Sequence, residues 1–283
     1  TNVHLLSSFP MSQSDGLLSC ADRGGEARFD AGSCRAAGIT VCRPVRILRP
    51  SCSVQAVDTT LSRAAASIST GTDWWGGMPD PFDPRFAMAT ERAVAIAARD
   101  HRDDPWLIGF FADNELAWAG PGEDAKSRYA LAYGTLRMTT DVPAKRAFLK
   151  QLRDKYRNEE GLSKAWGIQL AGWELMEDPG FEPPMPSSEH PEIEADFKYF
   201  QKTFADAYFK TISDSLKWHA PNQLLLGGRF AVSTPEAVAS CAQYCDVLSF
   251  NMYTLKPQDG YDFAALRALD KPVLITEFNQ LKT

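Results

Sequence analysis

The feature that most constrains the fold of this chain is an alternation of short apolar segments with helical segments between residues 87 and 277. Short apolar runs predict strands, and apolar residues spaced three or four apart predict helices. The predicted strands are 106–115, 223–227, 246–253 and 272–277, and the predicted helices are 87–100, 141–156, 193–216, a short one from 234, and 263–269. Such an alternation indicates an α/β protein with a parallel sheet and helices packed outside it.

Two glutamates end two of these predicted strands. Glu115 closes the run that begins at Trp106, and Glu277 closes the run that begins at Pro272. A carboxylate just past the C-terminal end of a parallel strand is where a β/α barrel keeps its catalytic groups. A glycosidase needs two carboxylates, one to protonate the leaving oxygen and one to attack or to activate water. The non-catalytic alternative for Glu115 is a helix cap or a solvent-exposed acid in a loop. The alternative for Glu277 is an exposed residue at a strand end.

Other residues at predicted strand ends are candidates for the same site. Asn251 and Tyr253 emerge from the strand just before Glu277 in chain order, and a tyrosine there can hold a nucleophilic carboxylate or simply pack at the rim. Arg229 follows two glycines, and it can pair with Glu115, pair with Glu277, or form a structural ion pair. Trp75 and Trp118 lie in loop or strand-end segments, where an indole can stack on a sugar ring.

Composition argues against several other classes of function. The net charge is −6 and no basic stripe is present, so a nucleic-acid partner is not expected. No apolar run reaches membrane-spanning length, and no signal peptide is recognisable at the N-terminus. The four histidines and six cysteines show no zinc-binding spacing, so neither a metal nor another cofactor is expected. The oligomeric state is not indicated.

Several motifs, in order along the chain, resemble those of glycoside hydrolase clan A. Within that clan they look most like the family 50 β-agarases, with the family 42 β-galactosidases as relatives. The resemblance covers about residues 72–283. The motifs that carry it are Pro79–Phe86, Asp104–Leu116, Leu226–Ala231, Asp246–Tyr253 and Pro272–Phe278.

The resemblance implies a (β/α)8 TIM barrel and a retaining mechanism. It assigns Glu115 as the acid/base and Glu277 as the nucleophile. It also implies that Asn114 holds the sugar 2-hydroxyl and that Tyr253 supports the nucleophile. The carboxyl groups of a retaining pair are expected roughly 5–5.5 Å apart.

The chain departs from a complete barrel at both ends. It stops six residues after Glu277, so we expect the eighth strand to be absent and the strand 272–277 to lack a neighbour on that side. Residues 1–70 lack clear periodicity and do not resemble the first strand–helix units. We therefore expect an irregular segment at 1–70, a partial catalytic barrel at 71–283, and a fragment of a longer protein. Residues 1–70 are either an out-of-frame translation or an unfamiliar extension.

These observations predict a retaining glycoside hydrolase that cleaves β-galactosidic links in a galactan such as agarose. Its partner is then a polysaccharide or oligosaccharide, and its full-length parent is expected to be secreted or periplasmic. One alternative is a β-galactosidase that acts on small substrates. The other is a carbohydrate-binding protein that keeps the barrel scaffold without catalysis.

Overall fold

Most of the described strands are parallel, and one short pair, β2 (Ser67–Ile68) and β3 (Met78–Pro79), is antiparallel. The computed structural model describes residues 3–5, 66–72, 77–99, 101–104, 107–254 and 259–278. Strand β4 (Gly109–Phe110) pairs in parallel with β5 (Leu224–Leu225), and a parallel bridge from Phe230 to Phe250 continues the order to β6 (Leu248–Asn251). Strand β6 pairs in parallel with β7 (Val273–Glu277), which pairs with β1 (Val3–Leu5). The described strands do not close into a barrel.

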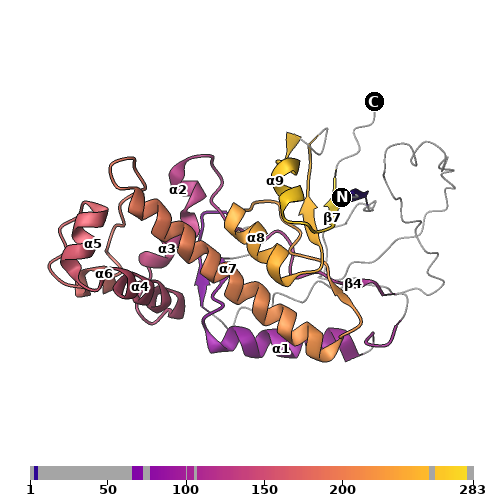
Figure 1. The fold of residues 1–283 in the computed structure, drawn as a ribbon. Helices are drawn as coiled ribbons and strands as arrows, with labels where there is room; N and C mark the ends of the chain where they lie inside the picture. Colours follow the sequence, from indigo (N-terminus) through magenta and orange to yellow (C-terminus); the bar gives the residue numbers. More distant parts are fainter. Residues whose placement is uncertain are drawn as a thin grey trace.

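The pairing of β1 with β7 corrects one prediction. We expected the strand at 272–277 to lack a neighbour on its far side, but Val3 to Leu5 run beside Val273 to Ile275 in parallel register. The indigo arrow of β1 lies beside β7 in Figure 1. A strand edge carries unpaired N–H and C=O groups that favour pairing with any available strand. Most of the predicted irregular segment, residues 6–65, lies outside the described residues.

Two glycines permit the close approach of these strands. A Cβ atom on Gly109 would lie 2.1 Å from the carbonyl oxygen of Leu224, so only glycine fits where β4 meets β5. Gly227 adopts a φ of 86° at the turn after β5, a conformation that glycine takes without strain. The course of the backbone toward Arg229 therefore depends on a glycine in β4 and on a glycine just after β5.

Helices surround the strands and extend beyond them. The central one is α7 (Pro191–His219), which packs against α1 (Pro84–Arg99) and α8 (Pro235–Tyr244). The other helices are α2 (Ala125–Arg128), α3 (Ala130–Leu136), α4 (Pro143–Tyr156), α5 (Glu159–Trp166), α6 (Glu174–Glu177) and α9 (Phe263–Ala268). Figure 1 shows α3 to α6 gathered at one end of α7 and the labelled strands β4 and β7 toward its other end.

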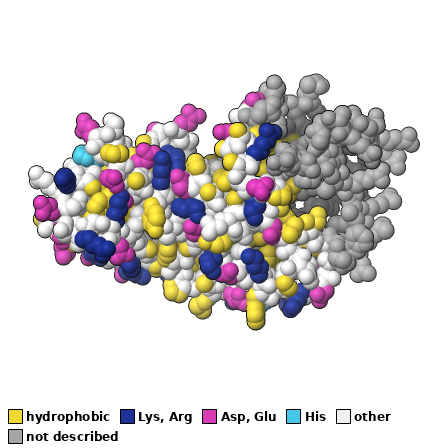
Figure 2. Space-filling view, viewed as in Figure 1, with side chains coloured by type: hydrophobic (Ala, Val, Ile, Leu, Met, Phe, Trp, Pro, Cys, Tyr) yellow, Lys and Arg dark blue, Asp and Glu magenta, His cyan; other side chains and the backbone are white. Residues whose placement is uncertain are grey.

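The predicted long helix at 193–216 is confirmed as α7. Its apolar residues recur every three or four positions, and the fully buried ones include Phe197, Phe204, Tyr208 and Phe209. Burying such an apolar stripe is the main source of helix stability in a folded protein. None of the helices among the described residues is both long and apolar enough to cross a membrane. On the face shown in Figure 2, acidic and basic side chains are interspersed.

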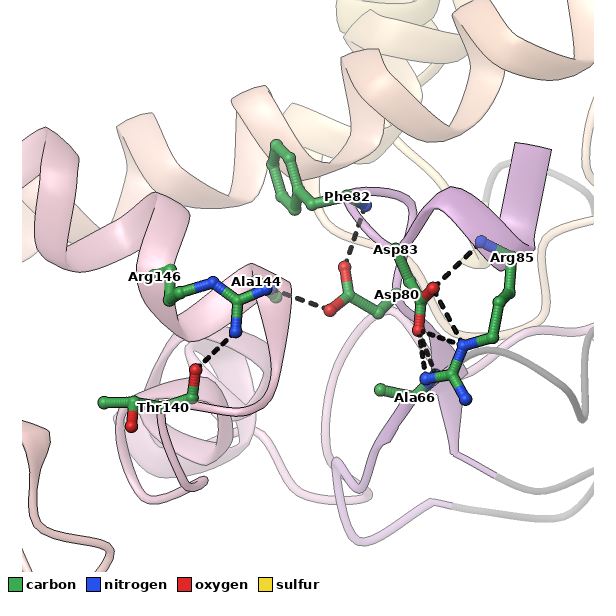
Figure 3. Close-up of polar contacts among 8 residues, drawn as sticks. All are labelled: Ala66, Asp80, Phe82, Asp83, Arg85, Thr140, Ala144 and Arg146. Carbon is green, nitrogen blue, oxygen red and sulfur yellow. Dashed lines mark hydrogen bonds and ion pairs between the residues drawn. The ribbon is translucent and has the colours of Figure 1, made fainter.

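Two aspartates anchor the start of α1. The buried carboxylate of Asp80 accepts backbone N–H groups from Phe82 at 2.8 Å and from Ala144, the second residue of α4, at 2.7 Å. Asp83 accepts the backbone N–H of Ala66 and the guanidinium of Arg85 (Figure 3). That guanidinium holds the pKa of Asp83 well below its usual range, whereas burial raises the pKa of Asp80. The carboxylate of Asp80 thus joins the turn before α1 to the start of α4.

Replacing Asp80 with alanine should destabilise the protein by about 3 kcal/mol, because two backbone donors would lose their acceptor in a buried place. The free energy of unfolding can be measured in urea by tryptophan fluorescence. Asp154→Ala is the control, since Asp154 pairs with Lys150 on the exposed surface of α4. Its loss should cost less than about 0.5 kcal/mol. Equal effects for both variants would contradict the anchoring role of Asp80.

Candidate active site

The first wall of the site is the turn after β4. The chain from Phe110 to Glu115 continues beside the chain from Leu225 to Arg229, with the N–H of Ala112 donating to the carbonyl of Gly227 at 2.9 Å. The N–H of Glu115 then donates to the carbonyl of Arg229 at 3.3 Å. Glu115 therefore lies past the C-terminal end of β4, as the sequence analysis predicted.

This turn has an unusual backbone. Asp113 has a φ of 61° and Glu115 a φ of 55°, and Arg229 across from them has a φ of 45°. Positive φ at a residue other than glycine costs on the order of 1–3 kcal/mol, and it persists only where the surroundings hold it. Such residues cluster at ligand-binding and catalytic sites, so their grouping here supports a functional reading of the turn.

The second wall is the end of the β6–β7 pair. The register shifts by one residue after Phe250, so that Asn251 lies opposite Glu277 and Thr276 is the extra residue. The N–H of Met252 donates to the carbonyl of Glu277 at 2.7 Å, which closes the pair. A bulge of this kind re-aims side chains at a strand end. Here it sets Asn251 and Glu277 side by side.

The side chain of Asn251 connects the two walls. It is 4% exposed, and its Nδ2 donates to Glu115 Oε1 at 2.8 Å and to Asn114 Oδ1 at 3.1 Å. Its Oδ1 accepts a hydrogen bond from the hydroxyl of Thr276 at 2.6 Å. Because a carboxylate accepts hydrogen bonds, the amide nitrogen faces Glu115 and the amide oxygen is left to accept from the Thr276 hydroxyl. Asn251 thereby holds the carboxylate of Glu115 and the amide of Asn114 together.

Glu277 has a partner on each carboxylate oxygen. The guanidinium of Arg229 donates to Oε1, and the hydroxyl of Tyr253 donates to Oε2. The Arg229 and Glu277 side chains are only 14% and 16% exposed, so this pair is stronger than a surface ion pair. Arg229 also lies over the ring of Phe111, 5.5 Å from its centre. Of the partners considered for Arg229, the structure shows Glu277.

The hydroxyl of Tyr253 stays protonated over the usual pH range. Burial of the phenol raises its pKa, and the hydrogen bond to Glu277 and the charges of Glu277 and Glu115 raise it further. Arg229 acts in the opposite direction, but it is the smallest of these effects. Both carboxylates thus act on one phenol. Tyr253 therefore keeps its proton and donates a hydrogen bond to Glu277.

A pocket of about 540 Å³ opens beside these groups, a size typical of small-ligand sites. Its lining residues are Glu115, Ala231, Asn251, Met252, Tyr253, Thr254, Gly260 and Tyr261. Glu277 is not among them, but its hydrogen-bond partner Tyr253 is. The geometry therefore allows a ligand in the pocket to contact Glu115 directly and Tyr253 beside Glu277.

One of the predicted aromatic contacts is wrong, and another lies outside the described residues. Trp118 is 2% exposed and stacks on Phe209 in the core, with Tyr208 packed edge-on against it. Its indole offers no free face to a sugar, because the apolar segment after the turn folds back into the core instead of staying in the loop. Trp75 is the residue outside the described part of the chain.

Three residues of this region escaped the sequence analysis. Thr276 reaches the site through the bulge, and a register shift leaves no sequence signal. Asp113 reaches α7, where the hydroxyl of Tyr208 donates to its carboxylate. Tyr208 itself was recognised only as one member of the apolar stripe of its helix. Among the described residues, no group of three or more His, Cys, Asp or Glu side chains could hold a metal ion.

Comparison with known proteins identifies a family. The family model for glycoside hydrolase family 42, described as Beta-galactosidase, matches residues 81–271. Beta-agarase B of Vibrio sp. (strain JT0107) is 35% identical over 218 residues, and Beta-agarase A of the same strain is 34% identical over 223 residues. These matches cover 76% and 74% of this chain but only 22% of each agarase. The chain thus spans about a fifth of the length of these curated relatives.

Solved structures show the same relationship. An exo-β-agarase superposes with a TM-score of 0.69 at 34% identity, over 76% of this chain and 29% of that structure. The agarase AgWH50C superposes with a TM-score of 0.68 at 34% identity, over 76% of this chain and 30% of that structure. Three quarters of the chain therefore follow the backbone arrangement of these two proteins.

Replacing Thr276 with valine should destabilise the protein by about 1–2 kcal/mol, because the buried oxygen of Asn251 would lose its hydroxyl donor while the volume stays nearly equal. Denaturant unfolding measures the change. Thr211→Val is a matched control, since the Thr211 hydroxyl bonds only to a carbonyl of its own helix, that of Ala207. The control should change stability by less than about 0.5 kcal/mol. Similar values for both variants would show that Thr276 does not hold the Asn251 amide.

Proposed function

The chain belongs to the glycoside hydrolases of the family 42 β-galactosidase model and resembles the family 50 β-agarases, and on that premise we propose that it carries the catalytic pair of a retaining β-agarase. The enzyme would cleave β-galactosidic links in a galactan such as agarose. Its parallel strands and surrounding helices would form part of a (β/α)8 barrel, with the site at the C-terminal ends of the strands.

One observation carries this proposal. Glu115 lies past the end of β4 and Glu277 ends β7, with β5 and β6 between them in the parallel order. A continuous set of hydrogen bonds through Asn251, Thr276 and Arg229 joins the two glutamates. Two carboxylates held beside one pocket are what glycoside hydrolysis requires. Their separation of roughly 5–5.5 Å, which retention implies, remains part of the proposal.

The two glutamates would act together in each of two steps. Glu277 attacks the anomeric carbon while Glu115 gives a proton to the departing oxygen, which yields a glycosyl-enzyme ester. Glu115 then takes a proton from water, the water attacks the same carbon, and Glu277 leaves with the configuration retained. Arg229 and Tyr253 hold both oxygens of Glu277, which fixes the direction of its attack. Asn114, next to Glu115, would bind the sugar 2-hydroxyl.

The substrate class follows from the relatives. Both curated relatives and both solved structures are named as agarases, so a long galactan is favoured. A polymer of this kind is too large to enter a cell, so the enzyme would work after secretion. The family model is described as Beta-galactosidase, and this favours small β-galactosides as the second candidate. A binding protein without catalysis remains the third candidate from the sequence.

An assay with the full-length protein that carries this sequence tests the substrate. We expect reducing sugar to be released from agarose or agaro-oligosaccharides faster than galactose is released from lactose, because the relatives are agarases. Faster release from lactose would support the second candidate. Binding to agarose without release of sugar would support the third. A protein inactive with all of these substrates would contradict the proposed function.

The roles of the two glutamates predict different mutant behaviour. Glu277→Ala should remove activity on every substrate, because no glycosyl-enzyme can form. Glu115→Ala should lower kcat for natural substrates by roughly 10²–10⁴-fold, the usual size of acid–base catalysis, but should spare glycosyl transfer from an activated aryl glycoside. Azide should restore turnover of Glu115→Ala and yield a glycosyl azide of retained configuration. Equal losses for both variants with no rescue would contradict these roles.

A further inference from the structure

A buried hydrogen bond connects the catalytic turn to the central helix. The hydroxyl of Tyr208, on α7, donates to Oδ2 of Asp113, which comes two residues before Glu115. Tyr208 is fully buried and Asp113 is 7% exposed. Asp113 is not among the residues that line the pocket. Burial and the Asp113 charge raise the pKa of Tyr208, so the phenol keeps its proton.

The ring of Tyr208 is held on several sides. It packs against Phe86 of α1 at 5.4 Å, against Trp118 at 5.3 Å and against Phe209 at 5.0 Å, measured between ring centres. A tyrosine ring has only two rotatable bonds, so packing of this kind fixes the position of its hydroxyl. The donor that Asp113 meets is therefore part of the rigid core.

The turn needs such a fixed point. Asp113 and Glu115 both have positive φ, so a relaxed backbone would rotate the Glu115 side chain away from its present direction. From the pocket side, Asn251 holds the Glu115 carboxylate at 2.8 Å. From the core side, Tyr208 holds Asp113. Asn114 lies between these two attachments, and the three consecutive residues are thus held from opposite directions.

We propose that Tyr208 is a positioning residue for the acid/base Glu115, acting through Asp113. This inference rests on the proposed function. It assigns to a core tyrosine a role in proton transfer to the leaving group, in addition to its packing. A small displacement of a proton donor lowers the rate of the step that needs it, even when the fold and the substrate contacts remain.

The test uses leaving groups of different quality. A dinitrophenyl β-galactoside needs little protonation to depart, whereas phenyl β-galactoside and agaro-oligosaccharides need the acid. In the full-length protein, Tyr208→Phe should lower kcat/KM for the poor leaving groups by about tenfold or more, and for the dinitrophenyl substrate by less than about threefold. Azide should raise the turnover of Tyr208→Phe less than that of Glu115→Ala, because the carboxylate is still present.

Tyr156→Phe provides a matched control. The Tyr156 hydroxyl donates to Oδ2 of Asp196, a carboxylate that is 1% exposed, at 2.6 Å. It lies on α4, away from the pocket residues. This variant should lose stability in the same way as Tyr208→Phe but should show equal changes with all leaving groups. Melting temperatures of both variants separate a loss of stability from a loss of acid catalysis.

A second variant guards against a simple folding defect. Asp113→Asn keeps a residue that tolerates positive φ but weakens the bond from Tyr208, so it should show the same dependence on leaving group to a smaller extent. The losses in the double variant should add up to less than the sum of the two single losses, because both changes weaken the contact between Tyr208 and Asp113.

The outcomes separate this inference from the proposed function. If Glu115→Ala shows the dependence on leaving group and Tyr208→Phe loses activity equally on all substrates, Tyr208 is structural only and the inference is wrong. If Glu115→Ala itself shows no such dependence, the role of Glu115 is wrong and the proposed function fails with it. Full activity of Tyr208→Phe on agaro-oligosaccharides would also overturn the inference.

Discussion

The amide of Asn251 is the interaction on which the rest of the site depends. It meets Glu115 and Asn114 with its nitrogen and Thr276 with its oxygen, and it is almost completely buried. If any of these partners is removed, a buried polar atom loses its hydrogen bond and the folded state is destabilised. The arrangement is therefore favourable only when the turn after β4 and the end of β7 are both in place. The amide thus makes the position of one carboxylate depend on the strand that carries the other. Arg229 adds to the same dependence, because its carbonyl meets the Glu115 backbone while its guanidinium meets Glu277.

The strand order and the placement of the two glutamates could be predicted from the sequence, because both follow from periodicity. Apolar runs alternate with helical stripes, and parallel strands bring their C-terminal ends to one edge. The short helix from 234 was also predictable: Thr234 accepts the N–H of Ala237 and Pro235 opens the first turn, as local capping chemistry requires. Predictions of this kind need only neighbours in the sequence.

What could not be predicted depends on contacts between distant residues. The bulge that inserts Thr276 reflects how β7 pairs with β6, and the residues around Phe250 give no local sign of it. Trp118 was expected to be available to a sugar because it lies in a loop or strand-end segment, yet it is buried and stacks on Phe209 of α7. The pairing of β1 with β7 joins the two ends of the chain, and a three-residue strand has too little periodicity to be recognised in advance. Each of these features is decided by tertiary packing, which overrides local preference.

The strands and the helical core beneath them hold the site in different ways. The strands supply direction, since they place both carboxylates at one edge. The core beneath them supplies stiffness, since Tyr208, Phe209 and Trp118 pack closely and a close-packed interior resists displacement. A backbone with positive φ at Asp113 and Glu115 is unfavourable by itself, and contacts from both layers must oppose its relaxation. The direction of the Glu115 side chain therefore depends on the central helix as much as on the strand that precedes it.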